Sequence, residues 1–365
     1  MTNSVPTIIP ATSEYEAWLA SQVRVVKADL QAKHKLMAED GFSFLRATFY
    51  RWAQLFPALC PRLAGAPEVL GVGDLHVENY GTWRDAEGRL VWGINDFDEA
   101  CPLPYTNDVV RLATSACLAI ESDDLTIGRG AACSMILEGY AVGLEAGGRA
   151  VVLSERNRWL RDAVTSRLRD PKKFWQKVAA QPLVRDVPTD VRSLLNAALP
   201  EPGLEVRMVH RQSGLGSLGR PRFTALAEWC GGKVAREAKP LLPSAWLWTA
   251  GGAAGDRRIY YDECVRRAAR AHDPFLQTDG GWILRRLSPY CSRIELTQLP
   301  RWRDETKLLW TMGYELANVH LGTPAARARI RRDLNRSRPK WLRRSAETMT
   351  EAILADWKEW KRKTA

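Results

Sequence analysis

The chain has 365 residues, a length at which one large or two modest domains bury most of their apolar surface without disulfides. Lysine and arginine outnumber aspartate and glutamate by 53 to 42, and the net charge of +11 suggests an anionic partner. The seven cysteines are scattered and form no C-x-x-C pair, which argues against a disulfide framework and a zinc finger. No apolar run of about 18 residues and no secretory pattern occurs. We therefore expect a cytoplasmic protein that does not enter a membrane.

The spacing of apolar residues indicates a mixed α+β fold. Up to about residue 200 the chain is mostly helical, and two short predicted strands each lead into acidic or amide residues. Strand-like segments begin near residue 203, and the one at 223–229 alternates as expected for a strand with one buried face. The last helix is amphipathic and is expected to pack on the protein's own body. The predicted helices are 14–30, 44–56, 107–120, 135–144, 258–271, 304–322 and 342–360, and the predicted strands are 69–72, 90–94, 204–210, 223–229, 233–238 and 282–287.

Two polar clusters carry the strongest chemical signal, because each follows an apolar strand. They are G-D-L-H-V-E-N at 73–79 and N-D-F-D-E at 95–99. The spacing of Asp74 and Asn79 is typical of a phosphotransferase catalytic loop. In such a loop the carboxylate orients the attacking hydroxyl and accepts its proton, and the amide oxygen holds Mg²⁺.

The second cluster supplies an acid that completes the magnesium shell. Asp96 is the first candidate and Asp98 is the alternative, since Mg²⁺ prefers oxygen ligands. Two other interpretations exist. The acids could serve only as turn formers and helix caps, or Asp74 and His76 could begin the ligand set of a two-metal phosphoesterase. The second of these needs further histidines, and the remaining ones lie in no matching motif.

A complete G-x-G-x-x-G motif lies between two predicted strands. Its glycines are Gly214, Gly216 and Gly219, and Ser217 lies among them. In a dinucleotide-binding fold this loop leads into a helix, so the order strand, loop, strand instead favours the nucleotide-covering hairpin of a kinase-like lobe. The alternative is a hairpin whose glycines serve only the turn.

The strand after this hairpin should present a cation to the phosphates of a nucleotide. Lys233, Arg236 and Lys239 are available there. A partner acid is expected from the following helix, where Asp262 and Glu263 are candidates. The alternative is that the three cations are exposed charges at a strand edge.

A basic patch lies near the C-terminus. Between Arg327 and Arg344 the chain has nine basic residues and one acid. The patch is either a solvated face or the contact surface of a polyanion-binding module, although no known nucleic-acid-binding motif accompanies it.

With these motifs, the chain resembles an uncharacterised bacterial family called domain of unknown function 2252, itself distantly similar to aminoglycoside phosphotransferases and protein kinases. The resemblance runs over residues 42–322, and the motifs at 73–81 and 95–100 are its most specific parts. It implies a protein-kinase-like fold of two lobes. It leaves the phosphate acceptor undefined.

The motif order differs from that of kinases, in which the glycine loop comes first, so we expect a circular permutation. The helix at 313–322 resembles the one that leads into a kinase catalytic loop, which would place the ancestral joint between Gly322 and Val69. In similar phosphotransferases an acid at the place of Asp108 braces the catalytic loop. The expected parts are a helix-rich lobe with the catalytic loop and metal site at 1–200, a β-rich nucleotide-covering lobe at 201–300, and C-terminal helices at 301–365 that pack back on the first lobe.

Two positions depart from the related families. The family strand V-K-E-A reads A-R-E-A here, so Arg236 stands where a phosphate-binding lysine is expected, and the two are not interchangeable. Either Arg236 binds the phosphates, or Lys239 or Lys233 does so, or the chain is a nucleotide-binding pseudoenzyme. Val72 replaces the histidine that precedes the catalytic aspartate of aminoglycoside phosphotransferases, and His76 is expected nearby. The sequence therefore predicts an ATP- and Mg²⁺-dependent phosphotransferase acting on an unidentified small-molecule or protein acceptor.

Overall fold

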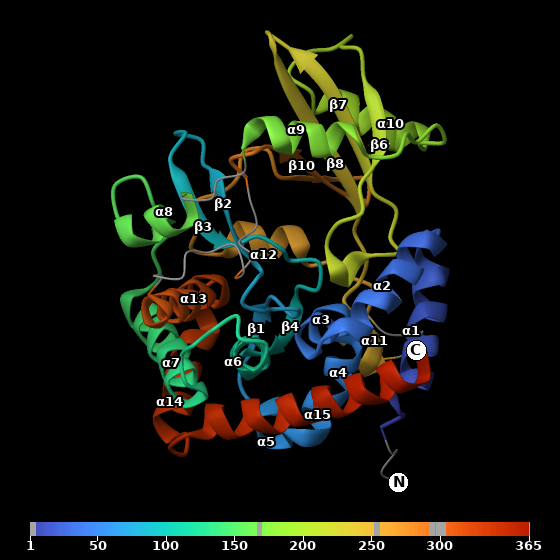
Figure 1. Cartoon of the computed structure of the whole chain (residues 1–365). Helices are drawn as coiled ribbons and strands as arrows, with labels where there is room; N and C mark the ends of the chain where they lie inside the picture. The colour runs from blue at the N-terminus through green and yellow to red at the C-terminus, as the bar shows by residue number, and fades with distance from the viewer. Residues whose placement is uncertain (1–4, 166–169, 252–255, 292–295, 297–303, 365) are drawn as a thin grey trace.

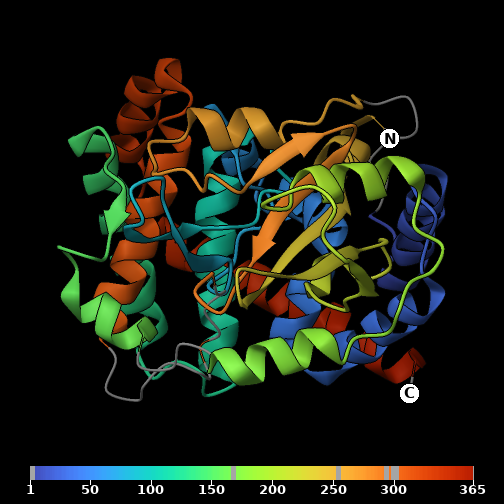
Figure 2. The same cartoon turned by 90° about the horizontal axis from the view of Figure 1, so that it is seen from above.

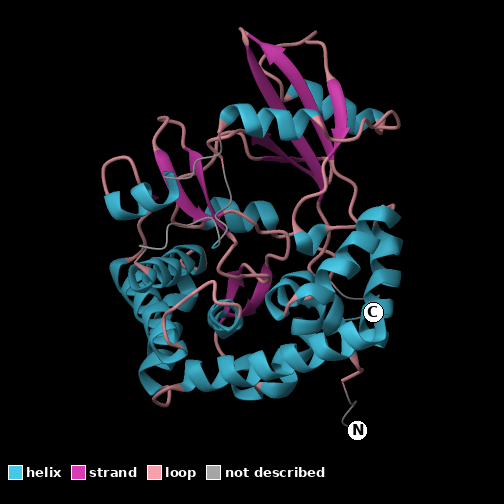
Figure 3. Ribbon diagram, in the orientation of Figure 1, coloured by secondary structure: helices cyan, strands magenta, loops and turns pink. Residues whose placement is uncertain are grey.

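Helices form one end of the molecule and an antiparallel sheet forms the other (Figure 1). The structure is a computed structural model that describes residues 5–165, 170–251, 256–291, 296 and 304–364. The same division is clear when the chain is coloured by secondary structure (Figure 3). No helix within these described ranges is long and apolar enough to span a bilayer. The expected boundary near residue 300 lies outside the described residues.

The sheet has five antiparallel strands in the order β6-β7-β8-β10-β9. Helix α10 packs on one face and helix α9 on the other, and Figure 2 shows this end from above. The bounds are β6 (Arg207–His210), β7 (Phe223–Trp229), β8 (Gly232–Pro240), β9 (Gln277–Asp279), β10 (Trp282–Leu287), α9 (Pro171–Ala179) and α10 (Thr189–Ala197).

The prediction of a single buried face at 223–229 is wrong, because helices cover both faces of this strand. Phe223 and Ala225 pack with the α10 side, whereas Leu226 packs with Phe174 and Val178 of α9. Alternation along a strand separates two faces but does not reveal that both are covered.

The helical end contains two small sheets, β1 with β4 and β2-β3-β5, around which the helices pack. Its elements are α1 (Ile8–Gln22), α2 (Lys27–Glu39), α3 (Gly41–Ala47), α4 (Phe49–Leu59), α5 (Pro61–Ala64), β1 (Glu68–Gly71), β2 (Tyr80–Arg84), β3 (Leu90–Ile94), β4 (Cys101–Pro104), α6 (Tyr105–Glu121), α7 (Arg129–Ala146), β5 (Val151–Val152), α8 (Arg158–Thr165), α11 (Ala245–Gly251), α12 (Tyr261–Arg267), α13 (Glu305–His320), α14 (Pro324–Arg336) and α15 (Trp341–Thr364).

Helices α7 and α13 are in backbone contact, and glycines make this possible. A Cβ at Gly139 would overlap the carbonyl oxygen of Trp310, and one at Gly313 would overlap that of Ile136. This packing fixes α13, whose last turn reaches the site described below. Helix α15 lies across the same end, where Trp357 donates to the backbone of α2.

Several predicted helices differ from the observed ones in their bounds. The helix expected at 14–30 is α1 and α2, because the chain is extended at Val23 and Val26. Asn107 is not an N-cap, since α6 begins at Tyr105 and the Asn107 side chain accepts a hydrogen bond from Trp52 at 2.8 Å. Such breaks depend on contacts with distant parts of the chain, as when the Val26 amide bonds to Gly219.

Candidate functional site

The loop after β1 is held by one carboxylate. Asp108, in the first turn of α6, accepts hydrogen bonds from the Val72 amide at 2.6 Å and the Gly73 amide at 3.0 Å. Gly73 has a positive φ, and a Cβ there would lie 2.4 Å from the Glu99 carbonyl oxygen. The expectation that Asp108 braces this loop is confirmed. The second acidic motif is thereby packed directly against the first.

Asp74 lies at the end of this loop and is oriented by an arginine. One carboxylate oxygen is bonded to the guanidinium of Arg111, which is fully buried in α6. Its other oxygen, Oδ2, lies only 3.1 Å from where a Cβ of Gly216 would be. Burial raises the pKa of Asp74, and the Arg111 cation opposes this rise. Asp74 is therefore a fixed carboxylate with one oxygen turned toward the glycine loop.

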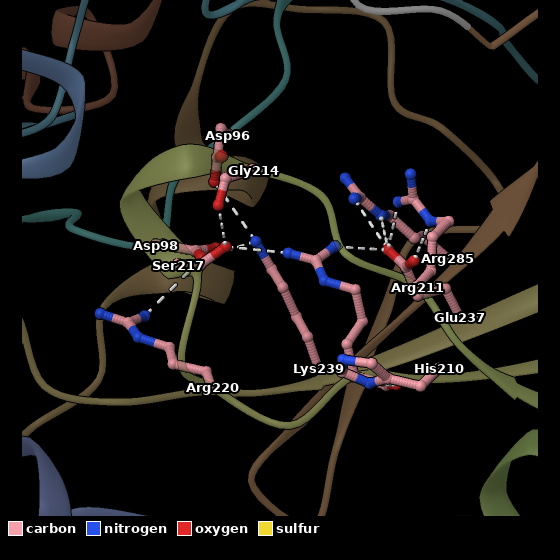
Figure 4. A network of polar contacts seen from close by, with 11 residues as sticks. Asp96, Asp98, His210, Arg211, Gly214, Ser217, Arg220, Glu237, Lys239 and Arg285 are labelled. Atoms are coloured by element: carbon pink, nitrogen blue, oxygen red, sulfur yellow. Dashed lines mark hydrogen bonds and ion pairs between the residues drawn. The ribbon is translucent and has the colours of Figure 1, made fainter. Parts of the chain in front are cut away.

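Asp96 and Asp98 follow β3 and share a cation. The ammonium of Lys239 lies 2.5 Å from Asp98 Oδ2 and 3.4 Å from Asp96 Oδ1 (Figure 4). Burial acts to raise the pKa of Asp96, but Lys239 and the hydrogen bond with Asp98 outweigh it, so this pKa is lowered. Burial and the charge of Asp96 raise the pKa of Asp98. Asp96 is therefore the more readily ionised member of the pair, and Arg220, 3.8 Å from Asp98 Oδ2, is a second cation beside the pair.

The residues predicted to bind Mg²⁺ fit an ion that also takes ligands from a phosphate. Asp98 Oδ1 is buried and has no hydrogen-bond partner among the described residues. The side chain of Asn79 donates its Nδ2 to the Asp74 carbonyl, which leaves the amide oxygen as its possible ligand atom. In the described part of the chain no group of three or more His, Cys, Asp or Glu could hold a metal ion by itself. Mg²⁺ commonly takes one or two carboxylates and completes its shell with water and phosphate oxygens.

The glycine loop lies over Asp74 and is held from two sides. Gly214 and Gly219 have positive φ values, and a short helical turn, Leu215–Ser217, lies between them. From the helical end, Lys33 of α2 donates to the Gly216 carbonyl at 3.2 Å. From the sheet, Arg222 donates to Ser217 Oγ at 2.8 Å. The glycine loop is thus held against Asp74.

Two adjoining cavities contain most of the predicted site residues. The smaller, about 40 Å³, is polar, and the larger, about 360 Å³, extends beneath the sheet. Asp96 and Gly214 line both of them. The predicted residues that line the smaller cavity are Asp74, His76, Asn79, Asp96, Asp98, Gly214, Gly216 and Ser217.

His76 is a buried residue of the loop at 73–79. It is 4% exposed, and its Nδ1 accepts a hydrogen bond from the Glu78 amide. The edge-to-face contact with Phe42 fixes its ring. His76 and Asp74 both line the smaller cavity.

Of the three cations considered on the third strand of the sheet, the structure places only Lys239 at the carboxylates. Arg236 faces α10, where its Nε donates to the Ala198 carbonyl at 2.8 Å and its guanidinium covers Phe275. Lys233 pairs with Glu228 near the other end of the strand. Alternation decides this outcome, because residues 237 and 239 share one face and residue 236 lies on the other.

The acid expected to pair with this cation does not come from the following helix. Asp262 pairs with Arg266, and Glu263 pairs with Arg258 and Arg267. These pairs lie within or beside α12. The acids that pair with Lys239 are Asp96 and Asp98, so the expectation of a partner acid from the following helix is wrong.

A cluster that the sequence analysis missed surrounds Glu237 (Figure 4). Its fully buried carboxylate contacts Arg211 at 2.6 Å, Arg222 at 2.7 Å and Arg285 at 2.9 Å. Burial acts to raise the pKa of Glu237, but the three guanidinium groups hold it well below its usual range. The three arginines lie far apart in the sequence, one just after β6, one just before β7 and one within β10, and no local pattern says that they meet.

The basic patch at 327–344 is partly engaged with the protein itself. Arg327 donates to the backbone carbonyls of Leu144 and Glu145 at the end of α7. Arg331 pairs with the Glu145 side chain, and Arg343 pairs with Glu347. These contacts use part of the patch to cap a helix and to form surface ion pairs.

Comparison with known proteins finds similarity in one segment of the chain. The comparisons with curated proteins and with solved structures found no match. Residues 24–153 match the model of a family described as an uncharacterized protein conserved in bacteria, DUF2252, which is the family that the motifs resemble. The matched segment includes the loop at 73–79, the second acidic motif and Asp108.

Proposed function

We propose that the protein is an ATP- and Mg²⁺-dependent phosphotransferase with a kinase-like site. The observation that carries this proposal is the meeting of four features at two cavities joined by Asp96 and Gly214. They are the fixed carboxylate of Asp74, the carboxylate pair with its unsatisfied oxygen, the glycine loop, and Lys239. These are the parts from which kinase-like phosphoryl transfer is built.

In this proposal Asp74 orients the acceptor hydroxyl and takes up its proton. The raised pKa of Asp74 makes it a better base than an exposed aspartate, and Arg111 fixes its position. Asn79, Asp96 and Asp98 would hold Mg²⁺, and the bound ion would neutralise charge on the phosphates. Lys239 exchanges its contact with Asp98 for a contact with a phosphate oxygen. The small cavity of about 40 Å³ requires the glycine loop to move away from Asp74 when the phosphate chain and the acceptor enter.

The kinase-like fold and the permutation are part of this proposal. The glycine loop joins the first two strands of the sheet and Lys239 lies on the third, which is the kinase arrangement. The Leu70 amide of β1 donates to Thr323 Oγ1 at 2.9 Å, and His320 contacts Asp108 at 3.0 Å. The end of α13 therefore lies where a kinase helix would run directly into the catalytic loop, which supports a joint between Gly322 and Val69.

Thermal stabilisation by ATP, with and without Mg²⁺, tests the site. A ligand that binds only the folded state raises the melting temperature. We expect a Mg²⁺-dependent rise in the wild type that is lost in Asp96→Asn. Asp186→Asn is the matched control, because Asp186 is a highly exposed acid that lines neither cavity.

The readout separates the alternatives. Absence of stabilisation by Mg²⁺ and ATP in the wild type would contradict the proposal. Stabilisation without release of labelled phosphate to water, or to any of a panel of hydroxyl and amine acceptors, would favour the nucleotide-binding pseudoenzyme instead.

A further inference from the structure

The charged residues that line the larger cavity are mainly cations. Eight lysine or arginine residues line it, against two carboxylates, Asp96 and Asp273. Most small-molecule pockets are predominantly apolar with a few polar groups. A cavity of about 360 Å³ with this charge favours an occupant that is itself strongly anionic.

The cations extend along the strand away from the carboxylate pair. Glu237, which gathers three arginines, lies two residues before Lys239 on the same face of β8. At 3.3 Å per residue the two positions are about 6.6 Å apart. This separation is comparable to the length of a triphosphate. One anionic chain could therefore contact Lys239 at one end and the arginines around Glu237 at the other.

Aromatic side chains in the same cavity present little surface to a ligand. Trp83 is 4% exposed, Phe97 is 1% exposed and Tyr261 is 4% exposed. The guanidinium of Arg270 already covers the rings of Trp83 and Phe97, at 4.5 and 5.0 Å from their centroids. By contrast, the side chain of Arg285 is 29% exposed. A purine would find few ring faces to stack on, whereas phosphate oxygens would find accessible donors.

Further donors at this cavity have no acceptor in the protein. Nε and Nη1 of Arg270 and Nε of Arg286 have no hydrogen-bond partner among the described residues. Both arginines line the cavity. Buried donors without acceptors are costly, and an anionic ligand is the chemistry that would satisfy them.

We propose that this site selects its donor by the phosphate chain and not by the base. The residues that make the selection are Lys239, Arg211, Arg222 and Arg285, with Arg270 and Arg286 lining the same cavity. The ligand class is the linear triphosphate, whether it carries a nucleoside or not. The inference rests on the proposed function for the identity of the reaction, but its binding prediction can be tested separately.

Titration calorimetry of the full-length chain with Mg²⁺ and four probes tests the inference. The probes are ATP, GTP, inorganic tripolyphosphate and adenosine. We expect the Kd values of the first three to agree within about threefold, and adenosine not to bind at millimolar concentration. A Kd for ATP at least about tenfold lower than those for GTP and tripolyphosphate, or measurable binding of adenosine, would overturn the inference.

Variants connect the binding to the arginines. Arg285→Gln should weaken all three triphosphates about tenfold and equally, since it removes charge-assisted hydrogen bonds to the chain. Arg211→Gln serves the same purpose if Arg285→Gln folds poorly, and the melting temperature reports folding. Arg207→Gln is the control, because this exposed arginine of β6 does not line the cavity. Unchanged affinity in a folded Arg285→Gln variant, and in Arg211→Gln, would contradict the assignment.

The two proposals fail in different ways. Arginine-dependent binding of tripolyphosphate, together with no transfer of phosphate from ATP, would remove the proposed function and leave the inference in place. Transfer from ATP with strong selection against GTP would support the proposed function and remove the inference.

Discussion

The candidate site has two halves, one on the helical side and one on the side of the five-stranded sheet. The two halves carry opposite charge and are organised in the same way. On the helical side, acids follow β1 and β3, and the buried cation of Arg111 orients Asp74. On the sheet side, arginines gather around the buried anion of Glu237. Each half therefore contains a buried residue of the opposite sign, which orients Asp74 on the helical side and gathers three arginines on the sheet side. Lys239 and Arg220 join the halves, because Lys239 lies on the sheet and contacts Asp98, and Arg220 follows the glycine loop and pairs with Glu99.

This comparison separates groups that act on a ligand from groups that position them. Truncating one partner of a buried ion pair is expensive because it leaves an uncompensated charge. The positioning residues should therefore show their effect on stability, and the residues that face the cavity should show it on binding and transfer.

The largest effect is expected for Asp74→Asn. Removing the base should reduce phosphate transfer about 10²- to 10⁴-fold, which is the usual contribution of general acid–base catalysis. Binding of Mg²⁺ and ATP should persist, since the carboxylate pair and Lys239 are unchanged. Release of labelled phosphate, together with the Kd for ATP, gives both numbers. Transfer at the wild-type rate would show that Asp74 is not the base.

Glu237→Gln tests the other half through stability. Loss of the carboxylate leaves three guanidinium groups facing one another, and we expect the free energy of unfolding to fall by about 3–5 kcal/mol. Urea unfolding measures this change. Arg211→Gln is the matched comparison, because two arginines still neutralise Glu237, and it should cost much less. Equal losses in the two variants would contradict the role of Glu237 as the residue that holds the cluster together.

The two halves also differ in how far the sequence predicts them. Asp74, Asn79 and Asp96 come from short contiguous motifs, and local spacing is enough to select them as candidates, which the structure brings to one cavity. Arg211 and Arg285, on the other hand, contact the same carboxylate, that of Glu237, only because β6, β7, β8 and β10 pair in one sheet. Strand pairing over such distances is set by tertiary packing and is not encoded in any local pattern.

For a related reason, the sequence did not predict which cation of β8 contacts the carboxylates. A motif comparison aligns Arg236 with the family lysine, but the side of the strand on which each residue lies depends on what covers the two faces. Here α9 covers one face and α10 the other. The predicted helix bounds were wrong for the same reason, where contacts with distant residues break a continuous apolar pattern, as at Val26.

A second buried glutamate offers a pH test of the comparison. Glu315 of α13 is 1% exposed and accepts a hydrogen bond from Asn318 at 2.7 Å. Unlike Glu237 it has no cluster of arginines, and burial raises its pKa to about 7, with Arg270 opposing the rise. Because the folded state then binds a proton more tightly than the unfolded state, Glu315 makes stability fall as pH rises from about 4.5 through 7.

Glu315→Gln should remove this dependence. We expect the variant to gain about 1–3 kcal/mol relative to the wild type between pH 5 and pH 8, measured by urea unfolding at each pH. Glu351→Gln, at an exposed position of α15, is the control and should leave the profile unchanged. A wild-type profile that matches that of Glu315→Gln would show that Glu315 is ionised in both states.

The smallest effect on binding is expected at Arg236, the residue that the family motif singles out. Arg236 is 5% exposed and donates to the Ala198 carbonyl on the α10 face, away from both cavities. Arg236→Gln should therefore change the Kd for Mg²⁺ and ATP by less than about twofold, while Lys239→Gln should weaken it about tenfold or more. Calorimetry on the two variants decides which side of β8 faces the nucleotide. If Arg236→Gln weakened binding more than Lys239→Gln, the nucleotide would lie against α10. The two adjoining cavities would then not be the site of phosphate transfer.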